Sequence, residues 1–367
     1  MHEIKPLTGF RFLAALYVFL FHLTLPSRSP LLWLPFFLQV LLTKGQIGVV
    51  VFFVLSGFVL TYRHAEEFAS GEIKPLAYWG DFMGKRLARI YPLYLAGWGL
   101  TLAVTLYVQA APPFHIALLS ATLLQTYFPP LAMHWYDAGA WSVTNEIFFY
   151  LLFPLALPLL SRVRSRAPLL VLLAGCMLLG TFLHYWGWRG TPFAARPFQW
   201  VYSFPPARLA EFVAGMLAAL LVRRCTWTIS PWGAALLSAL AGWVLLTVPQ
   251  RISSVSYDFV VMPATVSLLT AMTQFPQHPL FRWLGSDLLR YFGRISYAFY
   301  IVQIPLSFAF DAAVAAQWFV PTSHWVLPVS FSVSVAAAAL LHTFLERPAQ
   351  RYVTSWKKSS VPSPRIA

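Results

Sequence analysis

An arginine and a histidine, Arg11 and His22, lie near the two ends of the first apolar segment of the chain. Eleven residues at 3.6 per turn return to nearly the same helix face about 16 Å further along, so the two side chains share one stripe. A neutral imidazole can accept the proton of an attacking hydroxyl, so His22 is a candidate general base. Arg11 is a second candidate catalytic residue on the same helix face. The alternative is that Arg11 extends to the membrane interface and His22 is a hydrogen-bonded interior residue.

Two further arginines, Arg86 and Arg89, stand three residues apart in the segment KRLARIYPLY. On a helix they share a face, and two guanidinium groups in that arrangement can bind phosphates bidentately. The spacing therefore predicts a site for a nucleotide-bearing donor such as a coenzyme A thioester. The alternative is that both arginines only anchor the helix at the cytoplasmic side.

Glu146 follows Trp141 in the segment AWSVTNEIFFY. If Trp141 marks the external interface, Glu146 lies about 7 Å inside it, at the depth expected for His22, and can orient the imidazole. Alternatively, Glu146 forms an ion pair with Arg208, although Arg208 can also pair with Glu211 three residues later. We expect Arg208, Glu211 and Trp141 to take part in binding the acceptor.

Apolar segments must position these residues, because the chain of 367 residues is 59% hydrophobic and 10% charged. A soluble domain carries about 25% charged residues, whereas runs of about 20 apolar residues cross a bilayer as helix. The apolar runs predict an all-α, polytopic membrane bundle of about ten transmembrane helices. They lie near residues 9–25, 47–63, 90–110, 141–160, 168–187, 204–222, 231–248, 258–275, 291–314 and 325–345.

The distribution of lysine and arginine predicts the orientation of this bundle. With the N- and C-termini in the cytoplasm, twenty of the 26 cations fall on the inner side. The remaining six are Arg28, Lys44, Arg189, Arg196, Arg208 and Arg251. The net charge of +14 therefore reflects membrane orientation rather than binding of nucleic acid.

The chain divides into a membrane domain, residues 1–350, and a tail, residues 351–367, which we expect to be disordered and cytoplasmic. Residues 31–42 and 114–127 are apolar but short and bracketed by prolines, so they predict interfacial or re-entrant pieces. Spacings typical of a metal site, a glycine-rich phosphate loop or a nucleophile elbow are absent from the sequence.

Taken together, these segments resemble acyltransferase family 3, the bacterial membrane O-acyltransferases that modify surface polysaccharides. The resemblance covers most of the chain and depends on the order of the motifs. The matching segments are PLTGFRFLAALYVFLFH, GVVVFFVLSGFVLTY, KRLARIYPLYL, AWSVTNEIFFYLLFPL, PPARLAEFVAGMLAAL, FGRISYAFYIVQIPL and FLERPAQR.

The resemblance implies that Arg11 and His22 form the family's arginine–histidine pair, and that Arg86 and Arg89 form its arginine pair. It also implies an acetyl-coenzyme A or other acyl-coenzyme A donor from the cytoplasm and a glycan or lipid-linked oligosaccharide acceptor outside. The chain departs from the family at Gln303, where relatives often carry a histidine, so we assign that position no role in proton transfer. Thr8 likewise replaces a common aspartate. Exopolysaccharide acetyltransferases of the xanthan type are similar in sequence start and size.

These features predict an O-acetyltransferase of the bacterial inner membrane with one passage through the bundle. Coenzyme A enters at Arg86 and Arg89, and its thioester reaches His22, which Glu146 holds. Formation of an acyl group on His22 is an open alternative. One alternative is a transporter or flippase for a lipid-linked oligosaccharide, which would also have polar residues within the membrane. Another is a structural subunit of an export complex, which would account for the helices.

Overall fold

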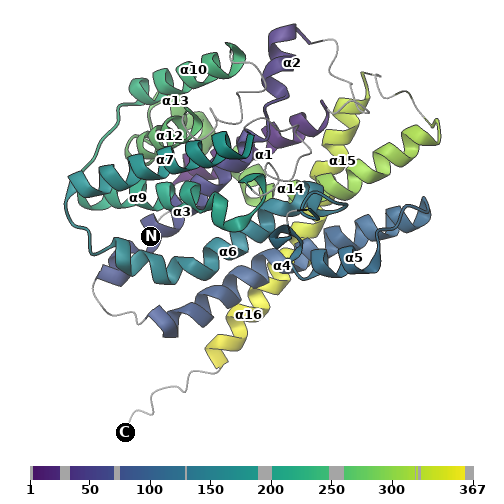
Figure 1. Ribbon diagram of the computed structural model, residues 1–367, viewed down its shortest axis with the longest axis horizontal. Coiled ribbons are helices and arrows are strands. Elements are labelled where there is room, and N and C mark those ends of the chain that lie inside the picture. The colour runs from purple at the N-terminus through teal and green to yellow at the C-terminus, as the bar shows by residue number, and fades with distance from the viewer. Residues whose placement is uncertain are drawn as a thin grey trace.

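The computed structural model describes residues 3–24, 34–69, 75–128, 130–188, 201–247, 260–318, 320 and 324–359. These residues form helices and connecting turns, without a strand, as the apolar segments predict (Figure 1). The main helices are α1 (Lys5–His22), α3 (Ile47–Ala69), α4 (Pro75–Tyr107), α6 (Asp137–Leu160), α7 (Arg166–Trp188), α9 (Leu209–Arg224), α10 (Pro231–Thr247), α12 (Met262–Gln274), α14 (Asp287–Ala315) and α15 (Val326–Leu341).

Each of the ten predicted apolar segments forms one of these helices in the described part of the chain. Seven stretches are long and apolar enough to cross a membrane: those of α3, α4, α6, α7 and α14, the run that ends with α9, and the run that begins with α15. The three other predicted spans correspond to α1, α10 and α12, which have 18, 17 and 13 residues. The chain is thus an all-α polytopic membrane protein.

Two helices begin earlier than the sequence predicts. Helix α4 begins at Pro75 rather than near residue 90, so Arg86 and Arg89 lie inside it. Helix α6 begins at Asp137, which places Glu146 about 14 Å from its start instead of the expected 7 Å. Both helices therefore contain an additional polar N-terminal part that the apolar runs do not indicate.

Helices α3 and α9 form the centre of the bundle. The apolar windows of α3 and α9 are 61% and 72% buried, and the two helices approach backbone to backbone. A Cβ atom at Gly57 would lie 2.0 Å from the carbonyl oxygen of Phe212, and one at Gly215 would lie 2.0 Å from that of Val54. Glycine at both positions therefore permits the close contact, as is common between membrane helices.

The outer helices present apolar side chains to their surroundings. Only 17% of the apolar window is buried in α7 and in the run that begins with α15. On α7, Val171, Leu178 and Phe182 are 60–70% exposed, and on α10 Trp232 and Trp243 are 67% and 63% exposed. Such a surface is stable against hydrocarbon rather than water.

The two short apolar stretches, for which the sequence predicts interfacial or re-entrant pieces, form short helices in the described part of the chain. Helix α2 (Phe36–Leu42) and helix α5 (Phe114–Ala121) extend about 11–12 Å, which is too short to cross the bilayer. A 3-10 turn, η2 (Gln125–Tyr127), follows α5. Residues 31–33 lie outside the described part.

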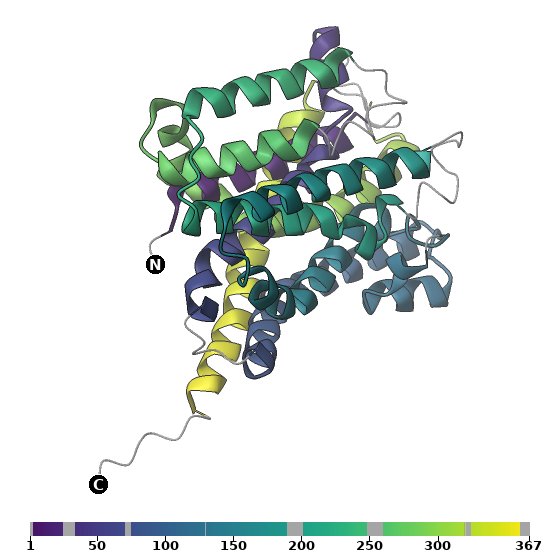
Figure 2. The same ribbon diagram turned by 60° about the vertical axis from the view of Figure 1, so that its left-hand side comes forward.

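The end of the chain differs from the prediction. After α15, a π-helical turn η6 (His342–Glu346) leads into α16 (Arg347–Ser359), which is helical over the first nine residues of the tail expected from residue 351. The division into a membrane domain and a cytoplasmic tail stays a prediction. Helix α16 packs at its start against α4 and then runs away from the bundle (Figures 1 and 2). The contact with α4 stabilises a helix that is too polar to be recognised from apolar periodicity. Residues 360–367 lie outside the described part.

Candidate active site

Arg11 and His22 are both on α1, as the sequence predicts, with His22 as the last residue of the helix. The unbroken helix separates the two positions by about 16 Å along its axis. The two side chains line two different cavities: Arg11 lines the larger one and His22 a smaller one. Arg11 and His22 are thus on the same helix, as predicted, but their side chains line two different cavities.

The larger cavity, which we name the arginine cavity, has a volume of about 780 Å³. Seven arginines and three glutamates line it: Arg11, Arg63, Arg86, Arg89, Arg223, Arg294, Arg347, Glu3, Glu146 and Glu346. Several lie where α3 and α9 end and α14 and α16 begin, so cations predicted on the inner side do gather at one end. The excess of positive charge suits a polyanionic ligand.

Arg86 and Arg89 lie in this cavity on α4, at the predicted helical spacing. The guanidinium of Arg86 lies 5.1 Å from the ring of Phe82 and 5.6 Å from that of Tyr150. Its Nε atom is buried and has no hydrogen-bond partner among the described residues. Ring contacts hold the guanidinium in place without neutralising it, so it can bind an anion.

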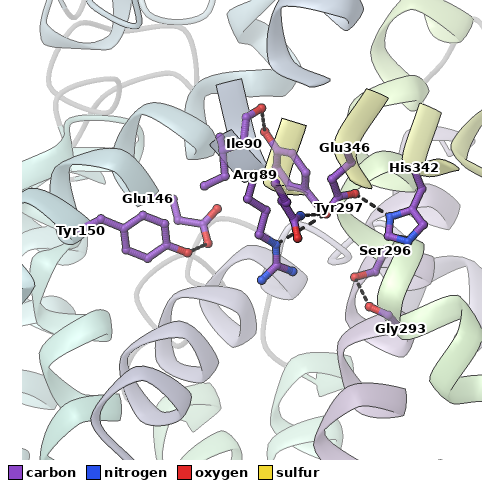
Figure 3. A network of polar contacts seen from close by, with 10 residues as sticks. Arg89, Ile90, Glu146, Tyr150, Gly293, Ser296, Tyr297, His342 and Glu346 are labelled. Atoms are coloured by element: carbon purple, nitrogen blue, oxygen red, sulfur yellow. Dashed lines mark hydrogen bonds and ion pairs between the residues drawn. The ribbon is translucent and has the colours of Figure 1, made fainter. Parts of the chain in front are cut away.

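Glu346 holds Arg89 from the opposite side of the cavity. Its carboxylate, 2% exposed, lies 3.7 Å from the Arg89 Nε atom and 2.8 Å from the His342 Nδ1 atom, and Gln350 Nε2 donates to it at 2.9 Å. Figure 3 shows the Arg89 side chain between Glu146 with Tyr150 on one side and Glu346 with His342 on the other. Glu346 lies in the π-helical turn η6, a distortion often found at functional sites.

Sequence reasoning missed Glu346. One signal was available, because His342 and Glu346 stand four residues apart at the end of an apolar segment. The contact between Glu346 and Arg89 could not be predicted from local spacing, because the two residues are far apart in the sequence.

Glu146 lies beside Arg11 and not beside His22. It accepts a short hydrogen bond from the Tyr150 hydroxyl, to which Ser56 Oγ also donates at 3.3 Å. The Arg11 guanidinium interacts electrostatically with Glu146, and both residues line the arginine cavity. The prediction that Glu146 orients His22 is therefore wrong, because the carboxylate lines the arginine cavity with Arg11, whereas His22 lines the other cavity.

His22 instead meets Gln303 of α14. The Nδ1 atom of His22 lies 3.1 Å from the Gln303 Oε1 atom. Because an amide oxygen can only accept, this contact places the imidazole proton on Nδ1 and leaves the lone pair on Nε2. Gln303, to which the sequence assigns no part in proton transfer, is thus the residue that contacts the imidazole of His22 at Nδ1.

Among the described residues, the predicted single passage between the arginine pair and His22 does not form one cavity. The two cavities have no lining residue in common. They come closest along α14, where Tyr300 lines the arginine cavity and Gln303, one turn further, lines the smaller one. The Tyr300 hydroxyl donates to the carbonyl oxygen of Gly139 and lies 2.7 Å from Ser142 Oγ. These contacts tie α14 to α6 at the boundary.

Arg208 brings the three predicted acceptor-binding residues together, because it contacts both Glu211 and the ring of Trp141. Arg208 and Glu211 form an ion pair at 2.7 Å with both side chains 2% exposed, which confirms the predicted pairing between them. Arg208 lies 5.7 Å from the rings of Phe53 and Trp141. Since the pair lines neither of the two cavities, its role in acceptor binding stays a prediction.

Comparison with known proteins supports the identification made from these motifs. The family whose description is acyltransferase domain, acyltransferase family 3, matches residues 5–343. Acyltransferase MdmB of Streptomyces mycarofaciens is 29% identical and the match covers 95% of this chain and 92% of that protein. Nodulation protein 10 of Rhizobium leguminosarum bv. viciae is 26% identical over 84% of this chain and 83% of that protein. No solved structure matches the chain. This chain belongs to acyltransferase family 3.

Proposed function

We propose that this enzyme transfers an acetyl or other acyl group from cytoplasmic acyl-coenzyme A to a sugar hydroxyl of an exopolysaccharide or other surface glycan, across the bacterial inner membrane. The observation that carries the proposal is the arginine cavity, in which Arg86 and Arg89 stand one turn apart on α4. Coenzyme A carries its phosphates at one end and its thioester at the other. A positively charged cavity in a membrane bundle can therefore bind the phosphates while the pantetheine chain with the thioester extends into the bundle.

His22 acts as the general base in this proposal. Its Nε2 atom takes the proton of the acceptor hydroxyl, the hydroxyl oxygen attacks the thioester carbonyl carbon, and the carbon–sulfur bond breaks. The thiolate of coenzyme A leaves and takes up the proton from the imidazolium. Because the two cavities have no lining residue in common, we expect side chains near Tyr300 and Gln303 to move before the thioester reaches the hydroxyl.

The role of His22 is tested by mass spectrometry of the surface glycan from cells that carry the intact chain, His22→Ala or no chain. We expect His22→Ala to remove the acyl groups as completely as loss of the chain, at equal amounts of protein in the membrane. His64→Ala is the matched control, because His64 also lies in a membrane helix but contacts Glu67 and Tyr78 outside both cavities. Unchanged acylation with His22→Ala refutes the role.

The donor site is tested by equilibrium binding of coenzyme A to the purified protein in nanodiscs. A charge-assisted hydrogen bond contributes about 1.5–3 kcal/mol, so Arg86→Gln should weaken binding by about 10- to 100-fold. Arg282→Gln is the control, because Arg282 is exposed and lines neither cavity. A transporter would move a lipid-linked oligosaccharide without consuming acetyl-coenzyme A, and that result would contradict the proposal.

A further inference from the structure

The arginine cavity holds more positive charge than the predicted pair Arg86 and Arg89 supplies. Seven arginines and three glutamates line it, which leaves an excess of four positive charges. Coenzyme A carries a diphosphate with two negative charges and a 3′-phosphate on its ribose with about 1.5–2 more. Its total charge of about −4 therefore matches the cavity as a whole and not the pair alone.

The inner part of the cavity has little net charge. Arg89 lies 3.7 Å from the carboxylate of Glu346, and Arg11 interacts electrostatically with Glu146. Arg86, the third half-buried arginine of the cavity, is held by two aromatic rings. Because two carboxylates face three guanidinium groups, this part does not offset the charge of the whole coenzyme A molecule.

The remaining positive charge lies at the rim of the cavity. Arg63, Arg294 and Arg347 line the cavity with exposed side chains, and none of them forms a hydrogen bond or ion pair with another described residue. Arg223 also lines it but pairs with Glu66 at 2.7 Å. The rim therefore offers guanidinium groups that no carboxylate of the described chain occupies.

Arg294 and Arg347 come from elements that lie next to each other. Helices α14 and α15 pack together, and Figure 3 shows Ser296 of α14 on the same side of the polar network as His342, which follows α15. Arg294 lies two residues before Ser296, and Arg347 directly follows η6. Two guanidinium groups can bind one phosphate monoester, because its three terminal oxygens are strong acceptors.

The distance between the inner part and the rim suits the two phosphate groups of one coenzyme A molecule. On α3, Ser56 donates to the Tyr150 hydroxyl beside the Arg86 guanidinium, and Arg63 lies seven residues nearer the rim, about 10 Å along the axis. Side chains lean toward the N-terminus of their helix, so Arg63 leans from the rim toward Ser56. Six bonds join the phosphorus next to the ribose to the 3′-phosphorus, and six bonds of an extended chain span about 7 Å.

We propose that Arg294 and Arg347 bind the 3′-phosphate of coenzyme A, while Arg86 and Arg89 bind its diphosphate. This inference rests on the proposed donor site, and it narrows the donor to a thioester of complete coenzyme A. An acyl group on the phosphopantetheine of a carrier protein lacks the 3′-phosphate and would leave the rim unused.

The test compares equilibrium binding of acetyl-coenzyme A and acetyl-3′-dephospho-coenzyme A to the purified full chain in nanodiscs. The wild type should bind the first about tenfold more tightly, the effect of about 1.4 kcal/mol, because solvent weakens contacts to exposed arginines. Arg294→Gln/Arg347→Gln should bind both nucleotides with equal affinity. Arg86→Gln should weaken both by the same factor and keep the preference, because both nucleotides carry the diphosphate.

Arg351→Gln is the matched control. Arg351 is exposed one turn after Arg347 on α16 and lines neither cavity, so its replacement removes the same charge and should keep the preference. Three results would each overturn the inference. They are equal binding of the two nucleotides by the wild type, an unchanged preference in Arg294→Gln/Arg347→Gln, and loss of the preference in Arg351→Gln.

The same measurement separates this inference from the proposed function. If the wild type binds neither nucleotide, the donor site is refuted, and the assignment of the rim is refuted with it. If the wild type binds both equally and Arg86→Gln weakens both, the donor site is retained and only the assignment of the 3′-phosphate to the rim is refuted.

Discussion

Replacing Glu211 by Gln leaves the charge of Arg208 buried. The two groups are 2.7 Å apart with both side chains 2% exposed, and at an effective dielectric constant of 20 they attract by about 6 kcal/mol. Desolvation offsets most of that attraction in the intact pair, but removal of one partner from a buried pair costs about 3–5 kcal/mol. The rings of Phe53, Trp141 and Tyr202 remain 5.7–6.0 Å from the guanidinium and retain part of its stabilisation. We therefore expect Glu211→Gln to lower the free energy of unfolding by about 3 kcal/mol.

Titration with sodium dodecyl sulfate in mixed micelles measures that free energy for the wild type, Glu211→Gln and the double variant Arg208→Met/Glu211→Leu. The double variant should recover most of the lost stability, because it leaves no charge buried. If Glu211→Gln keeps the wild-type stability but raises KM for the acceptor, the pair binds the acceptor, and the assignment to stability is refuted.

Three further changes test the packing and the arginine cavity. Gly57→Ala should lower thermal stability by the equivalent of about 1–3 kcal/mol, because a Cβ atom there would lie 2.0 Å from a backbone oxygen of α9. Gly99→Ala is the control and should leave thermal stability unchanged, because the space around Gly99 is open. If Glu346 positions Arg89, Glu346→Gln should raise KM for acyl-coenzyme A about two- to fivefold. A fall in KM would show that the carboxylate only offsets the positive charge of Arg89 and does not position it. Arg86→Lys should restore less than half of the binding free energy lost in Arg86→Gln, because an ammonium lacks the planar fork that stacks on the rings, and full restoration in the nanodisc binding assay would contradict this.

The positions of the helices were largely predictable from the sequence. Membrane helices need about 20 apolar residues, so ten apolar runs correspond to ten helices in the described part of the chain. Helix ends were less predictable, because α4 and α16 include polar turns that neighbouring helices support. The helix that carries Glu146 was predictable, but its start at Asp137 was not.

Spacing along a helix made parts of the candidate site predictable. Arg11 with His22, and Arg86 with Arg89, each depend on the period of one helix, and the structure places each pair on a single helix as expected. Gln303 lies 281 residues from its partner His22, so no local pattern relates them.

The sequence by itself determined that this protein is a membrane bundle of acyltransferase family 3, because apolar length and motif order are properties of the chain. Only the tertiary structure decided that Arg11 and His22 face two separate cavities, that Glu146 accompanies Arg11, and that Gln303 accompanies His22. Rotation and depth of each helix are set by side-chain packing against its neighbours, and that packing is a property of the whole assembly of helices.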